Sequence, residues 1–303
     1  MSEAAVHVKM EDRPNGARIA RVTLDNAAKL NCLSTTLIVS LAETFTRLAD
    51  DKGLRAVVLT GTGSRAFIGG ADLNELGAFC ADSARLFITR LHMACKAIRD
   101  CPVPVIGRVN GFCLGAGLEV AACCDFRAAA EGAQFGMPEV HMGIPSVIEA
   151  ALLPGLIGWG RTREMLLTGV LYSAAEALQM GFVQKAVPMA ELDGAIEPWL
   201  AGICRATPEA VRSQKALMGR WQRTSIDEGI YAGIDALSNA YKTGDTLWEG
   251  TVYGRASGKL YSGKVYVKTK DTIDIIGCKM VLLCRATPMT RVLLASAAGL
   301  IAG

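Results

Sequence analysis

The chain has 303 residues, of which 51% are hydrophobic and 20% charged, and its formal net charge is +3. This composition is typical of a folded protein with a large core and excludes a disordered chain. The small charge, with no basic block among aromatic residues, excludes a nucleic-acid partner, and no run reaches the roughly 18 apolar residues of a membrane span.

Cysteine and histidine usage gives no sign of a metal site. The ten cysteines lie mostly inside apolar runs without CxxC pairs, and His141 has no neighbour at ligand spacing. We expect reduced, buried thiols and no metal. The N-terminal residues 1–16 lack the features of a secretory signal, so an intracellular, cytoplasmic protein is expected, with mitochondrial and peroxisomal locations left open.

The first elements alternate between strand and helix. Residues 17–24 place apolar side chains at alternate positions, which predicts a half-buried strand. Ser34 is expected to cap a helix whose apolar stripe continues at helical spacing to Leu48, and residues 55–60 predict a buried strand. The order strand, helix, strand indicates a parallel crossover unit.

The alternation continues and then becomes mostly helical. Residues 251–270 are rich in Tyr, Gly, Ser and Lys and fit neither pattern. The expected elements are helix 84–99, strand 105–109, a helix from about Gly117, strand 125–129, helix 161–167, a helix with a capping box at Ser173, strand 182–187, a helix starting at Thr207-Pro208 and helix 226–241.

Two glycine-rich turns follow predicted strands, one at residues 67–73 (FIGGADL) and one at residues 114–117 (LGAG). Such turns let backbone N–H groups approach a ligand closely. Two N–H groups aimed at one carbonyl oxygen stabilise the charge that it gains in a transition state. Each turn alone is also typical of an ordinary strand-to-helix connection, and Asp72 fits a helix cap.

Two carboxylates accompany the second turn. Glu119 lies in the first turn of the predicted helix, and Glu139 follows Pro138. Taken alone, each acid has a simpler interpretation. Glu119 is an acid of the kind that the dipole favours in the first turn of any helix, and Glu139 is a solvated loop residue. Two carboxyls beside one water divide the roles of acid and base when their environments separate their pKa values. With the turns, they indicate enolate chemistry on an acyl group.

The ordered series of motifs resembles the crotonase superfamily, most closely its enoyl-CoA hydratase and isomerase members. The resemblance covers roughly residues 15–250. The matching segments are residues 30–33, 55–60, 67–73, 102–106, 110–111, 114–119, 124–125, 134–135, 138–139, 167–169, 174–177 and 181–183.

The resemblance implies an α/β fold, a crotonase-like spiral of ββα units followed by a C-terminal helical region. We expect the spiral core in residues 1–195 and helices involved in oligomerisation in residues 196–250. An atypical tail of unknown structure is expected in residues 251–303. The expected assembly is a homotrimer or a dimer of trimers.

The resemblance also implies a coenzyme A thioester as substrate, so that coenzyme A is part of the substrate and no separate cofactor is needed. By position, the amides of Ala71 and Ala116 would form the oxyanion hole. Glu119 and Glu139 would activate a water at C3 and deliver a proton to C2. The residues expected to bind the thioester are Lys29, Leu30, Gly69, Gly70, Ala71, Asp72, Leu73 and Gly115.

Four positions depart from the family pattern. Ala116 replaces the usual glycine, and Lys29 lies one place beyond the position of a basic residue that contacts the nucleotide. Ser146 replaces a glycine whose amide helps to hold water. Glu149 adds a carboxylate, which we interpret as a surface or capping acid rather than a third site acid, because carboxylates seldom lie unpaired inside proteins.

The leading prediction is hydration of a 2-enoyl-CoA to a 3-hydroxyacyl-CoA. The first alternative is isomerisation of a 3-enoyl-CoA to a 2-enoyl-CoA, for which one carboxylate can suffice. The second is a non-catalytic acyl-CoA-binding protein, against which the presence of both acids speaks. The acyl chain length and branching do not follow from the sequence.

Overall fold

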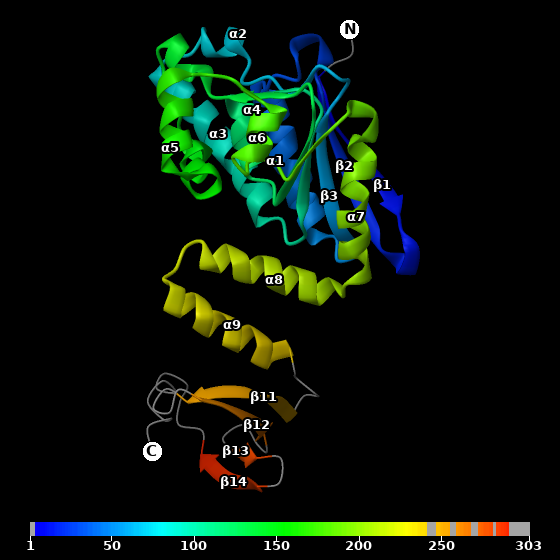
Figure 1. The fold of residues 1–303 in the computed structure, drawn as a ribbon, viewed down its shortest axis with the longest axis vertical. Helices are drawn as coiled ribbons and strands as arrows, with labels where there is room; N and C mark the ends of the chain where they lie inside the picture. Colours follow the sequence, from blue (N-terminus) through cyan, green and yellow to red (C-terminus); the bar gives the residue numbers. More distant parts are fainter. Residues whose placement is uncertain (1–3, 241–246, 255–258, 268–271, 281–282, 291–303) are drawn as a thin grey trace. The chain divides into compact units, whose positions relative to one another are not determined.

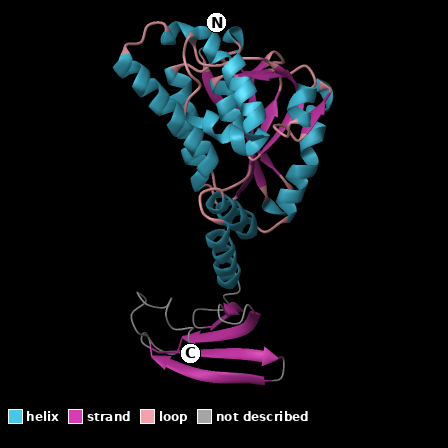
Figure 2. Ribbon diagram, turned by 60° about the vertical axis from the view of Figure 1, so that its left-hand side comes forward, coloured by secondary structure: helices cyan, strands magenta, loops and turns pink. Residues whose placement is uncertain are grey.

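The computed structural model describes residues 4–240, 247–254, 259–267, 272–280 and 283–290. They belong to two compact units, Met1–Arg212 and Ser213–Gly303. Figure 1 labels helices α1 to α9 and strands β1 to β3 and β11 to β14, and Figure 2 distinguishes helices from strands. The division expected at residues 195 and 250 stays a prediction.

A six-stranded sheet runs through the first unit, in the order β1-β2-β3-β5-β7-β10. β1 pairs antiparallel with β2, and all other neighbours are parallel. The predicted crossover between β2 and β3 is therefore confirmed. The bounds are β1 Ala5–Asp12, β2 Arg18–Asp25, β3 Leu54–Gly61, β5 Val105–Val109, β7 Phe126–Ala130 and β10 Lys185–Val187.

Helices cover both faces of this sheet because inner strands such as β3 are apolar on both sides. On β3, Val57 and Leu59 join a core cluster with helices α1 and α3, whereas Ala56 and Val58 join a second cluster with α7. The alternation follows the two-residue period of a strand. The helices of this unit are α1 Thr35–Asp50, α2 Leu73–Leu76, α3 Ala81–Asp100, α4 Ala116–Ala122, α5 Leu153–Thr168, α6 Ala174–Gln179 and α7 Leu192–Arg205.

Several sequence predictions of helix starts are confirmed. The Ser34 hydroxyl accepts a hydrogen bond from the Leu37 amide at the start of α1. Ser173 and Glu176 form the predicted capping box of α6. The strand predicted from Phe182 begins only at Lys185, because the Phe182 amide donates to the carbonyl of Ala177 and closes a turn.

A second, four-stranded sheet has the order β4-β6-β8-β9, and it consists of very short strands. β4 Ala66–Ile68, β6 Phe112–Leu114 and β8 Gln134–Gly136 are parallel neighbours, and β9 Tyr172–Ser173 is antiparallel to β8. The carboxyl ends of parallel strands lie at the same edge. The turns after β4 and β6 and the segment after β8 therefore lie together.

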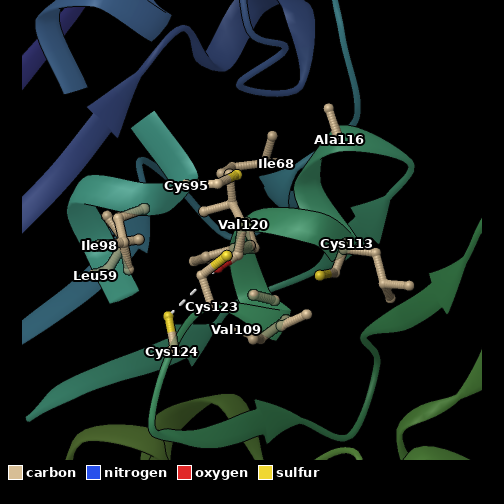
Figure 3. Close-up of a cluster of buried hydrophobic side chains, with 14 of the residues drawn as sticks. Leu59, Ile68, Cys95, Ile98, Val109, Cys113, Ala116, Val120, Cys123 and Cys124 are labelled. Atoms are coloured by element: carbon tan, nitrogen blue, oxygen red, sulfur yellow. Dashed lines mark hydrogen bonds between the residues drawn. The ribbon is translucent and has the colours of Figure 1, made fainter. Parts of the chain in front are cut away.

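The larger core cluster contains the predicted buried thiols (Figure 3). Four thiols are buried in this cluster: Cys95, Cys113, Cys123 and Cys124. Their neighbours are aliphatic side chains such as those of Leu59, Ile68 and Val120. Cys32, expected to be buried as well, is only partly so. These thiols act as small apolar side chains that let α3 and α4 pack closely.

A buried arginine, which the sequence analysis missed, closes the end of α4. The Arg127 guanidinium donates to the carbonyl oxygens of Ala121, at 3.1 Å, and Cys124, at 2.6 Å. Its Nε also donates to the Phe182 carbonyl, and the group lies over the Phe182 ring. The arginine thereby pairs carbonyls that a helix leaves open at its C-terminus.

In the second unit, helix α9 precedes an antiparallel sheet in the order β11-β12-β13-β14. This sheet occupies the tail for which the sequence pattern gave no structure (Figure 2). Helix α8 spans the boundary between the units. The bounds are α8 Pro208–Trp221, α9 Ile226–Ala240, β11 Leu247–Gly254, β12 Lys259–Val267, β13 Thr272–Met280 and β14 Leu283–Thr290.

Gly117 allows α4 to lie directly on β4, and its substitution tests this packing. A Cβ at Gly117 would lie 2.1 Å from the Ile68 carbonyl oxygen, whereas a Cβ at Gly155 of α5 meets nothing within 4 Å. Gly117→Ala should lower the free energy of unfolding by several kcal/mol, measured by thermal unfolding. Gly155→Ala should be neutral or stabilising by up to about 1 kcal/mol; equal effects of both changes would contradict the packing.

Candidate active site

Two backbone amides lie at the ends of the neighbouring strands β4 and β6. The Leu33 amide donates to the Gly70 carbonyl, and the Asp72 amide donates to the Leu33 carbonyl. Ala71 lies between Gly70 and Asp72, and its N–H takes no part in this pairing. Ala116 is the first residue of α4, where an N–H has no partner within the helix. Both amides can therefore donate to a ligand.

The backbone shape of the second turn depends on Gly115 and permits alanine at position 116. Gly115 has φ +52°, and a Cβ there would lie 2.6 Å from Oε1 of Glu139. Ala116 begins a helix, and among the described residues the non-glycine positions with positive φ are Leu30, Asn31 and Ile148. The alanine that replaces the family's glycine thus keeps an ordinary conformation and its amide donor.

Glu119 lies one turn into α4 and is only 4% exposed. Its Oε1 accepts a hydrogen bond of 3.1 Å from the Ala150 amide. Burial, with smaller contributions from the charges of Glu139 and Glu149, raises the pKa of Glu119 to about 8, against the opposing effect of the Ala150 amide. At neutral pH the free protein therefore holds this carboxyl mostly protonated.

Glu139 belongs to the short 3-10 helix Pro138–Met142 that follows β8. One of its oxygens lies over Gly115, and the other accepts a hydrogen bond of 3.0 Å from the Ser146 hydroxyl. Burial raises the pKa of Glu139, and the bond from Ser146 acts in the opposite direction. The fold thus brings both predicted acids to the turn that carries Ala116.

The residues expected to bind the rest of the thioester lie around the first turn. The Gly69 amide donates to the Leu30 carbonyl, which joins the segment at 29–33 to the end of β4. Lys29 Nζ lies 2.7 Å from Oδ2 of Asp72, and Asp72 caps α2 as the sequence predicted. Leu73 is 60% exposed. Lys29 is thus an exposed cation at the rim of the turn, already paired with a carboxylate.

The interpretation of Glu149 as a surface or capping acid is wrong, because its side chain is 2% exposed. Its Oε1 lies 2.9 Å from His92 Nδ1 and 3.4 Å from Arg99 Nη1, and its Oε2 has no partner among the described atoms. Neither His92 nor Arg99 was predicted from the sequence. Their spacing of seven residues, which places both on one face of a helix, was the available signal.

The structure also bears on metals and membranes. Among the described residues, no group of three or more His, Cys, Asp or Glu side chains could hold a metal ion. Within the same part of the chain, no helix combines the length and apolarity needed to cross a bilayer.

Comparisons with known proteins support the predicted resemblance. Residues 15–251 match the family described as enoyl-CoA hydratase/isomerase. The crotonyl-CoA hydratase of Syntrophomonas wolfei is 33% identical over 229 residues, which are 75% of this chain and 88% of that protein. The short-chain-enoyl-CoA hydratase of Clostridium acetobutylicum is 31% identical with the same coverage. A crystal structure of an enoyl-CoA hydratase from Bacillus anthracis has a TM-score of 0.73 at 30% identity, covering 78% of this chain and 92% of that one.

A second match covers residues 212–291, which resemble a family described as an uncharacterized protein conserved in bacteria (DUF2147). This span contains α9 and the strands β11 to β14. The tail that departs from the first family pattern therefore has relatives of a different kind.

The raised pKa of Glu119 predicts a pH-dependent stability effect. The folded-state pKa of about 8 lies above the ordinary value of 4.5, so the wild-type protein loses stability as pH rises between these values. Glu119→Gln removes this titration. Relative to wild type, the variant should gain a few kcal/mol in the free energy of unfolding between pH 5 and pH 9, measured by urea unfolding.

Glu131→Gln is the matched control, because Glu131 is exposed. Its stability relative to wild type should not change over this pH range. If the Glu119 variant showed the same flat behaviour, the buried carboxyl would not be held protonated.

Proposed function

This chain belongs to the enoyl-CoA hydratase/isomerase family, and on that premise we propose that it adds water across the double bond of a 2-enoyl-CoA thioester to give a 3-hydroxyacyl-CoA. The observation that carries this proposal is the convergence of the buried Glu119, the half-buried Glu139 and the free amides of Ala71 and Ala116 at one edge of the small sheet.

The first step is polarisation of the thioester. The carbonyl oxygen accepts hydrogen bonds from the amides of Ala71 and Ala116, which follow the parallel neighbours β4 and β6. These donors belong to the backbone, so they need no side-chain reorganisation as negative charge develops on the oxygen. The polarised thioester makes C3 electrophilic and stabilises the enolate that forms when oxygen adds there.

The second step is proton transfer by the two carboxyls. A water between Glu119 and Glu139 loses one proton to the ionised carboxyl as its oxygen bonds to C3, and the protonated carboxyl delivers a proton to C2. The raised pKa of Glu119 favours this residue as the one protonated in the free protein. One proton shared by the pair is what acid and base catalysis at neutral pH requires.

Two features favour hydration over isomerisation. Isomerisation moves one proton between two carbons and can use one carboxylate, whereas this site holds Glu119 and Glu139 beside the same turn. The two relatives compared above are also named hydratases. We further propose an acyl-CoA thioester as the binding partner, while the expected trimeric assembly stays a prediction.

Substitution of the acids tests the mechanism. Glu119→Gln and Glu139→Gln keep side-chain size but remove the transferable proton, so each should lower kcat by roughly 100-fold or more. Turnover is followed by the loss of ultraviolet absorbance of crotonyl-CoA. The exposed Glu131→Gln should retain wild-type activity, and full activity of both site variants would refute the mechanism.

Oxygen labelling separates hydration from isomerisation. Turnover of a 2-enoyl-CoA in ¹⁸O-labelled water should place one labelled oxygen in the product, detected by mass spectrometry. Conversion of a 3-enoyl-CoA to a 2-enoyl-CoA without label, and with no turnover of the 2-enoyl-CoA, would establish the isomerase alternative instead.

The oxyanion hole can be tested by removing one of its backbone donors. Ala116→Pro removes the N–H at the first position of α4, where proline is compatible with a helix. It should lower kcat by about 10²–10³. Ala81→Pro makes the same change at the first position of α3 and should leave kcat unaltered; equal losses would show a fold effect rather than a lost donor.

A further inference from the structure

We infer that Glu149 is a positioning residue for Glu119: held by His92 and Arg99, it fixes the turn whose Ala150 amide donates to the Glu119 carboxyl. This inference rests on the proposed function, because it assigns Glu149 a part in presenting the site acid. Nothing in the family resemblance predicted such a role.

The geometry joins the two glutamates through one peptide unit. Glu149 and Ala150 are consecutive residues of the 3-10 helix Ile148–Leu152. The Ala150 amide lies 3.1 Å from Oε1 of Glu119, and the side chain of Glu149 extends to α3. A shift of Glu149 therefore moves the donor that orients Glu119.

The turn needs an external restraint because its backbone is strained. Ile148 has φ +40°, a conformation that a β-branched residue rarely adopts. Such a conformation persists only where neighbouring contacts enforce it. The contacts of Glu149 with α3 supply that restraint from the next residue along the chain.

The contacts of Glu149 with α3 can hold its side chain in one position. Glu149 Oε1 faces His92 and Arg99, which lie two turns apart on one side of the helix. The side chains of His92 and Arg99 are 43% and 30% exposed, whereas that of Glu149 is 2% exposed. Removing the partners of a carboxylate so deeply buried is strongly destabilising, so the cluster holds one arrangement.

The same cluster acts on the electrostatics of the site. The charge of Glu149 raises the pKa of Glu119, in addition to the effect of burial, while the Ala150 amide lowers it. Glu149 therefore influences Glu119 both through the amide that it positions and through space. Because these two effects have opposite signs, the decisive measurement must report on the amide itself.

The experiment compares amide hydrogen exchange and kinetics in Glu149→Ala and in wild type. Loss of the anchor should speed the exchange of the Ala150 amide, while amides of β5 in the main sheet keep their wild-type protection. The value of kcat for crotonyl-CoA should fall roughly 10- to 100-fold, with little change in KM. Glu149→Gln, which can still accept from His92 and Arg99, should restore most of kcat.

A purely structural role would instead speed exchange at Ala150 and in β5 together, and that result would overturn the inference. Unchanged exchange at Ala150, or an unchanged kcat, would also overturn it. Should Glu149→Ala fail to fold, Arg99→Gln removes one partner and gives the same comparison, with the exposed Arg85→Gln on the same helix as control. Because exchange is read without turnover, a failure here is distinct from failure of the proposed hydratase activity.

Discussion

Parallel pairing of three very short strands is the constraint on which the candidate site depends. β4, β6 and β8 are neighbours, so the chain leaves all three at the same edge of the small sheet. The first two exits carry the amides of Ala71 and Ala116, and the third carries Glu139. Gly117, with no space for a Cβ against the Ile68 carbonyl, lets α4 begin directly at this edge and places Glu119 beside it.

The site opposes the usual preference of carboxyls for water. Glu119 is buried and retains its proton at neutral pH, and the Ala150 amide satisfies one of its oxygens. Glu139 is less buried and accepts from Ser146. Ser146 thus contributes a side-chain hydrogen bond at a position where the family resemblance implies a glycine. Such unequal environments let two chemically identical groups serve as acid and base.

Much of the architecture followed from local patterns in the sequence. In the long strands and helices, apolar residues recur at the spacing of a strand or of a helix, which a short stretch of sequence is enough to show. Ser34 and Ser173 mark the starts of two helices. The strands β4, β6 and β8 have three residues each, too few to show a period. The antiparallel strand β1 was missed although Val6, Val8 and Met10 alternate with polar residues at the period of a strand.

The site was predictable to the extent that its parts are contiguous in sequence. Both glycine-rich turns and both acids lie in motifs that could be read together. The burial of Glu149 could not be predicted from the sequence, because its partners His92 and Arg99 are 57 and 50 residues away in the chain. Only packing of α3 against the turn at 148–152 makes a buried carboxylate tolerable there.

The central claim is that two main-chain amides and two carboxyls surround one acyl group. A crystal structure of the protein with a bound, slowly reacting acyl-CoA analogue tests it most directly. The account predicts the thioester oxygen about 2.7–3.1 Å from the nitrogens of both Ala71 and Ala116, with Glu119 and Glu139 facing C2 and C3. A thioester bound elsewhere, or with its oxygen directed away from these amides, would contradict it.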